Sequence, residues 1–140
     1  MKNNPDYCIT TELTVSFHDT DAMGVVWHGN YLKFFEKARE ALFQKFNYGY
    51  KEMIESGYAW PIVDTRLKYT AMTVAEQTLQ ITAQLEEFEN RIKIGYIIRD
   101  AQTGKKTTTG YTIQVALSTQ TKEMSFITPD IFLERFGLLK

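Results

Sequence analysis

Hydrophobic residues follow two different periods along this chain, and the change between them separates one helical segment from several strands. Between residues 31 and 46, apolar side chains recur every three or four positions, as an amphipathic helix requires. They are Tyr31, Phe34, Phe35, Ala38, Ala41, Leu42 and Phe46, and the opposite face carries Lys33, Lys37, Glu40 and Gln44. We therefore predict a helix over residues 31–46, with Asn30 as its N-cap and residues 47–49 as its end.

Strict alternation of apolar and polar residues, the pattern of half-buried strands, dominates the rest of the sequence. It appears first at Leu13, Val15 and Phe17. It returns after residues 51–57, where a short helix is predicted, in a strand from residue 60 to about residue 70. Three more strands follow, with alternating apolar residues Leu79, Ile81, Ala83 and Leu85; Ile92, Ile94, Tyr96 and Ile98; and Tyr111, Ile113, Val115 and Leu117.

The connections between these segments predict the fold class. Short polar segments at residues 89–90 and 100–104 separate the last three strands and predict hairpin turns. Thr128 and Pro129 are predicted as the N-cap and first residue of a C-terminal helix. Strands joined by tight turns are antiparallel, and a sheet buries an apolar helix best by wrapping around it. We predict an α+β fold, an antiparallel sheet of about five strands around one long helix, whose free strand edges favour pairing with a second copy.

Composition indicates one ordinary globular domain over residues 1–140. Apolar residues make up 44% and charged residues 24% of the chain, as in typical soluble domains. The net charge of −1 gives no general attraction to nucleic acid or to an anionic membrane. Cys8 is the only cysteine, so neither an internal disulfide nor a cysteine zinc cluster is expected. The chain begins without the apolar segment of a signal peptide and contains no apolar run of about 18 residues, which fits a cytoplasmic protein.

The segment between the first strand and the long helix holds the candidate chemistry. It reads FHDTDAMGVVWHGNY over residues 17–31. A calcium EF-hand loop begins with the same Asp-x-Asp-x-x-Gly, but Met23 and Asn30 stand where that loop needs an oxygen ligand and a bidentate Glu. Phosphatases with an aspartate nucleophile need a parallel sheet, which this pattern does not predict. The two acids either shape a turn through Asx hydrogen bonds, with Gly24 at positive φ, or act as catalytic groups.

This segment and residues 35–39, Phe-Glu-Lys-Ala-Arg, closely resemble the hotdog-fold acyl-CoA thioesterases. The nearest branches are the hydroxybenzoyl-CoA thioesterase family and its Tol-Pal-associated relatives. The shared core is Asp-x-Asp-x-x-Gly-x-Val-x-x-x-x-Tyr followed by Glu-x-Ala-Arg. The resemblance implies a hotdog fold and hydrolysis of acyl-CoA or acyl-carrier-protein thioesters without a metal or cofactor. It also implies a homodimer or homotetramer with active sites at the subunit interface.

The resemblance assigns roles to individual residues. Asp21 is expected to be the catalytic carboxylate and Asp19 its structural partner. His28 is expected close to the thioester, with its backbone N–H on the carbonyl oxygen. The other residues expected to contact the substrate are Gly24, Val26, Trp27, Tyr31, Glu36 and Arg91.

These residue types suit the reaction, because a thioester needs a carboxylate to activate water or to attack, and a site for the oxyanion. The chain departs from its relatives at Met23, where a small residue is common, and in residues 69–79, which lack the usual Pro and Gly-Asp. Two alternatives stay open at this point. One is a hotdog dehydratase or isomerase, and the other is a non-catalytic acyl-thioester-binding module.

Overall fold

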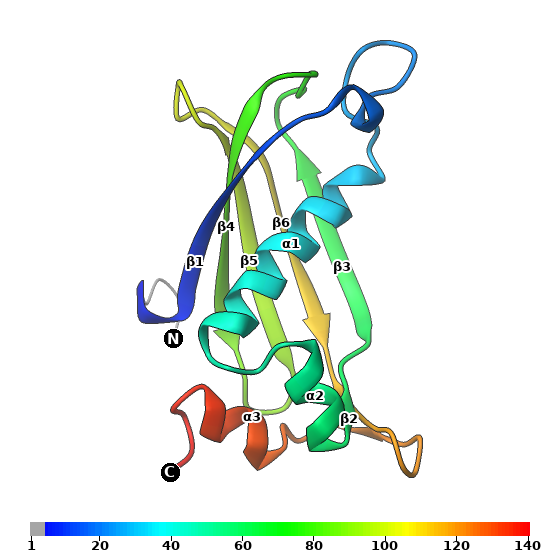
Figure 1. Cartoon of the computed structure of the whole chain (residues 1–140), viewed down its shortest axis with the longest axis vertical. Coiled ribbons are helices and arrows are strands. Elements are labelled where there is room, and N and C mark those ends of the chain that lie inside the picture. The colour runs from blue at the N-terminus through cyan, green and yellow to red at the C-terminus, as the bar shows by residue number, and fades with distance from the viewer. Residues whose placement is uncertain (1–4) are drawn as a thin grey trace.

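The computed structural model describes residues 5–140, so the first four residues of the N-terminal stretch lie outside the described residues. Five strands form one antiparallel sheet in the order β1-β4-β5-β6-β3. The helix α1 (Asn30–Lys45) crosses one face of this sheet (Figure 1). The strands are β1 (Cys8–Thr14), β3 (Ile62–Tyr69), β4 (Thr78–Glu87), β5 (Ile92–Asp100) and β6 (Lys106–Gln114). This is the predicted arrangement of five strands wrapped around one long helix.

Smaller elements gather at the end of the molecule where α1 finishes (Figure 1). They are α2 (Tyr50–Ser56), α3 (Asp130–Arg135) and a second sheet of β2 (Tyr58–Ala59), β7 (Ala116–Ser118) and β8 (Met124–Ser125). The loop between β1 and α1 lies at the opposite end, beside the end of β3. Two single turns of 3₁₀ helix, η1 (Pro5–Tyr7) and η2 (Phe17–Asp19), flank β1. Among residues 5–140, no helix has the length and apolar character needed to cross a membrane.

The core lies between α1 and the sheet. The alternating residues of β4 and β5 that the sequence predicts to be apolar are all at most 1% exposed, as are Phe35, Ala38 and Leu42 of α1. The rings of Phe35 and Tyr96 stack with their centroids 4.2 Å apart. Burial of one large apolar side chain stabilises the folded state by about 1.5–3 kcal/mol. Gly110 permits this close packing, because a Cβ there would meet the Phe35 ring and the Arg66 carbonyl.

The start of the helix and the end of the first strand differ from the predictions. The first strand ends at Thr14, and Phe17 belongs to η2 with 81% of its surface exposed. The cause is a capping arrangement, in which the backbone N–H and the Oγ of Ser16 both donate to Asp19 Oδ2 at 3.1 Å. Asn30 is the first helical residue and not the N-cap. Its side chain instead donates to the Asp19 carbonyl at 2.9 Å.

The other boundaries that differ lie near the second sheet. The strand predicted through Tyr111 and Leu117 is split, because β6 ends at Gln114 and β7 joins the smaller sheet. The last helix begins one residue later than predicted, with Pro129 as its N-cap. The predicted short helix is confirmed as α2. Both predicted hairpin turns are confirmed as well, at residues 89–90 and 100–104.

Candidate functional site

The loop between β1 and α1 folds back on itself as a short antiparallel ladder. Thr20 and Val26 form a β-bridge, and the Asp21 N–H donates to the Val25 carbonyl at 2.9 Å. One step further, the Trp27 N–H donates to the Asp19 carbonyl at 2.9 Å. The ladder places Asp21 near the tip of the loop.

A tight turn closes this ladder. Asp21 Oδ1 accepts the Met23 N–H at 2.8 Å, and the Gly24 N–H donates to the Asp21 carbonyl at 3.0 Å. Gly24 has a φ of +78°, a conformation that glycine adopts at little cost. Asp21 therefore forms an Asx turn, one of the two interpretations that the sequence left open. The turn leaves Asp21 exposed, and Oδ2 of its carboxylate has no hydrogen-bond partner within residues 5–140.

Asp19 has a structural task in the same loop. Its carboxylate caps η2 through Ser16, and its carbonyl accepts both the Trp27 N–H and the Asn30 side chain at 2.9 Å. Asp19 thereby ties the strand side of the loop to the first turn of α1. The two acids are two residues apart in sequence but have different surroundings.

The connection after β3 holds the loop in place. The Val26 N–H donates to the Thr73 carbonyl at 2.7 Å, and Val25 forms a β-bridge with Val74. The hydroxyls of Tyr31 and Thr73 are hydrogen-bonded at 2.7 Å, and both residues are buried. The position of the loop is thus set by residues far away in the sequence.

Tyr69, the last residue of β3, reaches the start of α1. Its hydroxyl donates to the His28 carbonyl at 3.3 Å. Its ring meets the Tyr31 ring edge-on, with the centroids 4.9 Å apart. Partial burial raises the pKa of the Tyr69 hydroxyl, and the neighbouring Tyr31 raises it further. The hydroxyl is therefore protonated and a hydrogen-bond donor at neutral pH.

The N-terminus of α1 offers backbone donors next to these groups. The N–H groups of Asn30 and Tyr31 donate back to the carbonyls of Trp27 and His28, at 2.9 and 3.4 Å. In the part of the chain that the structure describes, the N–H groups of His28 and Gly29 make no hydrogen bond. Free donors at the start of a 16-residue helix favour a negative charge there, because the helix dipole has its positive end at this terminus.

A shallow pocket of about 350 Å³ opens beside this helix start. It is lined by Val25, Val26, His28, Tyr31, Tyr69 and residues 70–73. Three predicted site residues, Val26, His28 and Tyr31, line it together. Asp21, Gly24 and Trp27 belong to the same loop but lie outside the lining.

Trp27 covers the last peptide before the helix. It is half exposed, and its ring packs on the His28 ring with a centroid distance of 5.1 Å. A Cβ on Gly29 would collide with the same indole ring. Glycine at position 29 therefore allows Trp27 to fold over the first turn of α1.

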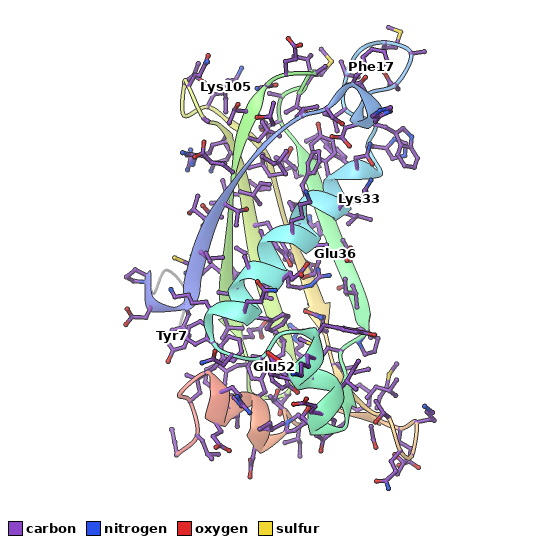
Figure 2. All side chains as sticks on the ribbon, viewed as in Figure 1. Tyr7, Phe17, Lys33, Glu36, Glu52 and Lys105 are labelled. Carbon is purple, nitrogen blue, oxygen red and sulfur yellow. The ribbon has the colours of Figure 1, made fainter. Side chains whose placement is uncertain are left out.

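Glu36 and Arg91 lie away from Asp21 within one chain. Glu36 projects from the middle of α1. In Figure 2 it lies between the end of the molecule that carries Phe17 and the part that carries Glu52. It borders a second, larger groove of about 640 Å³ between α1, α2 and β2. Arg91 lies beside the β4–β5 turn, where its guanidinium forms an ion pair with Glu87 at 3.0 Å. The predicted contacts of these two residues with a substrate stay predictions.

Tyr69 and Thr73 are residues of this site that the sequence pattern did not reveal. The pattern places Tyr69 only as one alternating residue of a strand. Thr73 lies in the segment that lacks the usual Pro and Gly-Asp, where Glu76 makes the bend with a φ of +71°. Only the pairing of residues 25–26 with residues 73–74 brings both side chains to the loop.

The chemistry of this arrangement is that of attack on a carbonyl group. An exposed carboxylate can act as a base or a nucleophile, and free N–H groups can stabilise an oxyanion. Within residues 5–140, no three His, Cys, Asp or Glu side chains come together in a way that could hold a metal ion.

Comparison with known proteins identifies the family. Residues 15–136 match the thioesterase-like superfamily. The chain is 31% identical over 77 residues to a putative acyl-CoA thioesterase, YneP, of Bacillus subtilis, covering 55% of this chain and 56% of that protein. It is 32% identical over 101 residues to a putative esterase of Synechocystis, covering 71% and 61%. The chain thus spans between about half and two thirds of the length of these curated relatives.

A solved structure has the same fold. The DHNA-CoA thioesterase from Staphylococcus aureus superposes with a TM-score of 0.83 at 25% sequence identity, covering 93% of this chain and 89% of that one. The predicted hotdog fold and the resemblance to acyl-CoA thioesterases are therefore confirmed. Because the family match includes the whole β1–α1 loop, α1 and four of the five strands of the main sheet, this chain belongs to the thioesterase-like superfamily.

Proposed function

We propose that the protein hydrolyses acyl-CoA thioesters to a free acid and a thiol. The β1–α1 loop of this thioesterase-like chain provides the observation that supports the proposal. An exposed carboxylate, Asp21, belongs to the same loop as the His28 and Gly29 N–H groups, which have no hydrogen-bond partner within residues 5–140. A thioester suits such a site, because its thiolate is a fair leaving group, with a thiol pKa of about 8.5 for a cysteine-like reference. The reaction therefore needs neither a metal nor a strong general acid.

In this proposal Asp21 acts in one of two ways. It removes a proton from water that attacks the thioester carbonyl, or it attacks the carbonyl itself and forms a mixed anhydride that water then hydrolyses. In either route the C–S bond breaks, and the CoA thiolate leaves and takes up a proton. In both cases the carbonyl oxygen gains negative charge, and the N–H groups of His28 and Gly29 donate to it. One oxyanion donor is typically worth a factor of about 10²–10³ in rate. Val26 and Tyr31, in the pocket wall, contact the acyl group.

The edge of the sheet extends the proposal to a homodimer. In β3 every residue except Leu67 is exposed, and this strand runs from Ile62, beside the larger groove, to Tyr69, beside the Asp21 loop. Antiparallel pairing of two such edges sets the loop of one copy against the groove of the other. Glu36, which borders this groove, then contacts the substrate from the second copy. The contact of Arg91 with the substrate rests on the family resemblance alone. Two such dimers pair into the homotetramer that the family resemblance implies.

The direct test is thiol release from a panel of aliphatic and aromatic acyl-CoAs, and from an acyl-carrier-protein thioester, followed with a thiol reagent. The proposal expects turnover of at least one acyl-CoA by the wild-type protein. A hotdog dehydratase or isomerase would change the acyl group without releasing thiol. A binding module would bind the substrate without turnover. The absence of thiol release across the whole panel would contradict the proposal.

A further inference from the structure

We propose that Tyr69 is a positioning residue for this reaction, whose hydroxyl fixes and polarises the peptide between His28 and Gly29. The kinetic part of this inference rests on the proposed function, and the structural part does not. Tyr69 is the last residue of β3 and lies outside the β1–α1 loop that carries Asp21 and His28. Its hydroxyl donates to the His28 carbonyl at 3.3 Å.

The Tyr69 ring is held against a fixed neighbour. Its edge-on partner, Tyr31, is only 4% exposed and is anchored by its hydrogen bond to Thr73. Tyr69 also lines the pocket beside the helix start, together with His28. The hydroxyl therefore approaches the His28 carbonyl from a defined direction at the edge of the candidate site.

The geometry of a peptide bond connects this contact to the oxyanion donors. The carbonyl of His28 and the N–H of Gly29 belong to one planar trans peptide and point in opposite directions. The carbonyl points along α1, where it also accepts the Tyr31 N–H at 3.4 Å. The Gly29 N–H consequently points out of the N-terminus of the helix, where it makes no hydrogen bond within the described residues.

A donor on the carbonyl changes the N–H of the same peptide. Hydrogen bonds in a chain polarise one another and strengthen each bond by about 10–30%. The Tyr69 hydroxyl thus strengthens the Gly29 N–H as a donor and restricts rotation of the peptide. If Tyr69 served only in packing, its ring alone would be sufficient. A test of the inference must therefore remove the Tyr69 hydroxyl and keep the ring.

The first experiment is the variant Tyr69→Phe, which keeps the ring against Tyr31 and deletes the hydroxyl. We expect kcat for acyl-CoA hydrolysis to fall about two- to tenfold, the factor that the loss of one hydrogen bond typically causes. KM and the melting temperature should stay close to those of the wild type. The matched control is Tyr111→Phe, on the opposite face of the sheet, where the Tyr111 ring lies under the Lys93 ammonium at 4.7 Å. It should leave both kinetic constants unchanged.

The second experiment needs no substrate. The backbone amide signal of Gly29 in a ¹⁵N–¹H spectrum should move in Tyr69→Phe and stay in place in Tyr111→Phe. An unmoved Gly29 signal, an unchanged kcat, or a change in KM alone would each overturn the inference. If the wild-type protein releases no thiol from any acyl-CoA, the proposed function fails. The Gly29 signal then still decides whether Tyr69 holds the peptide.

Discussion

Asp19 and Asp21 show how hydrogen bonding gives two identical side chains different tasks. Asp19 directs its carboxylate to Ser16 and its carbonyl to Trp27 and Asn30. Asp21 uses one oxygen in its own turn and keeps the other unpaired within the described chain. Each carboxylate keeps one oxygen without a hydrogen bond within residues 5–140, but Asp19 is half-buried, whereas Asp21 is exposed and open to water. The proposed catalytic role therefore belongs to Asp21.

His28 is predicted to matter mainly through its backbone. The variant His28→Ala retains the N–H proposed to bind the carbonyl oxygen and removes only the imidazole. We expect kcat/KM to fall by about tenfold or less, a cost of at most about 1.4 kcal/mol. Thiol-release kinetics measure this effect beside Asp21→Asn. A loss as large as that of Asp21→Asn would mean that the imidazole itself transfers a proton.

Gly24 is predicted to matter through its backbone conformation. A residue with a Cβ in the left-handed region typically costs about 1–2 kcal/mol, and a Cβ at Gly24 would meet no atom within 4 Å. Gly24→Ala should therefore lower the free energy of unfolding by about 1–2 kcal/mol in urea titrations. Gly29→Ala is the matched comparison, because its Cβ collides with the exposed Trp27 ring instead. Gly29→Ala should change the tryptophan fluorescence and should lower the free energy of unfolding less than Gly24→Ala does. A larger loss of stability in Gly29→Ala than in Gly24→Ala would contradict this account.

At the scale of elements, the local spacing of apolar residues predicts most of the main helix and strands. The buried face of α1 and the alternation of β4 and β5 follow from periods that a short window contains, so their positions are predictable. The ends of elements are not, because Asp19 ends the first strand by capping η2 through Ser16. The split between β6 and β7 likewise follows from a second sheet.

The candidate site likewise contains residues that the local sequence predicts and residues that only the structure reveals. Asp21, Gly24 and His28 lie within eight consecutive positions, and a sequence pattern shows them together. Tyr69 and Thr73 join the site only through the pairing of Val25 and Val26 with residues 73–74. No local period contains that pairing. The sequence therefore predicted the candidate residues of the β1–α1 loop. The residues that hold this loop in place, Tyr69 and Thr73, could be identified only from the structure.

The β5–β6 turn is predicted to make stability depend on pH. Asp100 accepts the N–H groups of Thr103 and Gln102 at 2.8 Å and the Gln77 side chain at 2.7 Å. The bond from Thr103, followed by that from Gln77, lowers the pKa of the Asp100 carboxyl. A lowered folded-state pKa contributes stability above the unfolded-state value of about 3.9 and loses it as pH falls through the folded-state value.

The variant Asp100→Asn tests this prediction, because it removes the titrating group. Between about pH 5 and pH 3, the urea midpoint of the wild type should fall more steeply than that of the variant. Both proteins are compared by the same unfolding titration at each pH. Parallel curves over this range would show that the turn does not contribute to acid sensitivity.

For the whole molecule, the exposed edge at β3 is the feature that needs a partner. Ile62 and Val63 are 43% and 48% exposed on this strand, and an uncovered edge presents unpaired backbone groups. We expect a dimer or tetramer at micromolar concentrations, and loss of activity when the dimer dissociates. Sedimentation velocity and thiol release at matched dilutions measure both properties.

A pair of variants locates the interface. Val63→Lys should shift the protein toward monomer, because it places a charge on the pairing edge. Thr10→Lys, on the opposite edge strand β1, is the control and should leave the assembly unchanged. A monomer with full activity would rule out a site shared between two copies.

The central claim is that Asp21 is the carboxylate that drives thioester hydrolysis, and one comparison tests it most directly. The variant Asp21→Asn is nearly isosteric but cannot act as a base, and Asp130→Asn, in the first turn of α3, is the matched control. For the best acyl-CoA of the panel, kcat/KM of Asp21→Asn should fall by a factor of at least about 10², as for loss of a general base. Asp130→Asn should keep the wild-type rate, and both variants should unfold cooperatively. If Asp21→Asn keeps more than about a tenth of the wild-type kcat/KM, Asp21 is not the catalytic carboxylate.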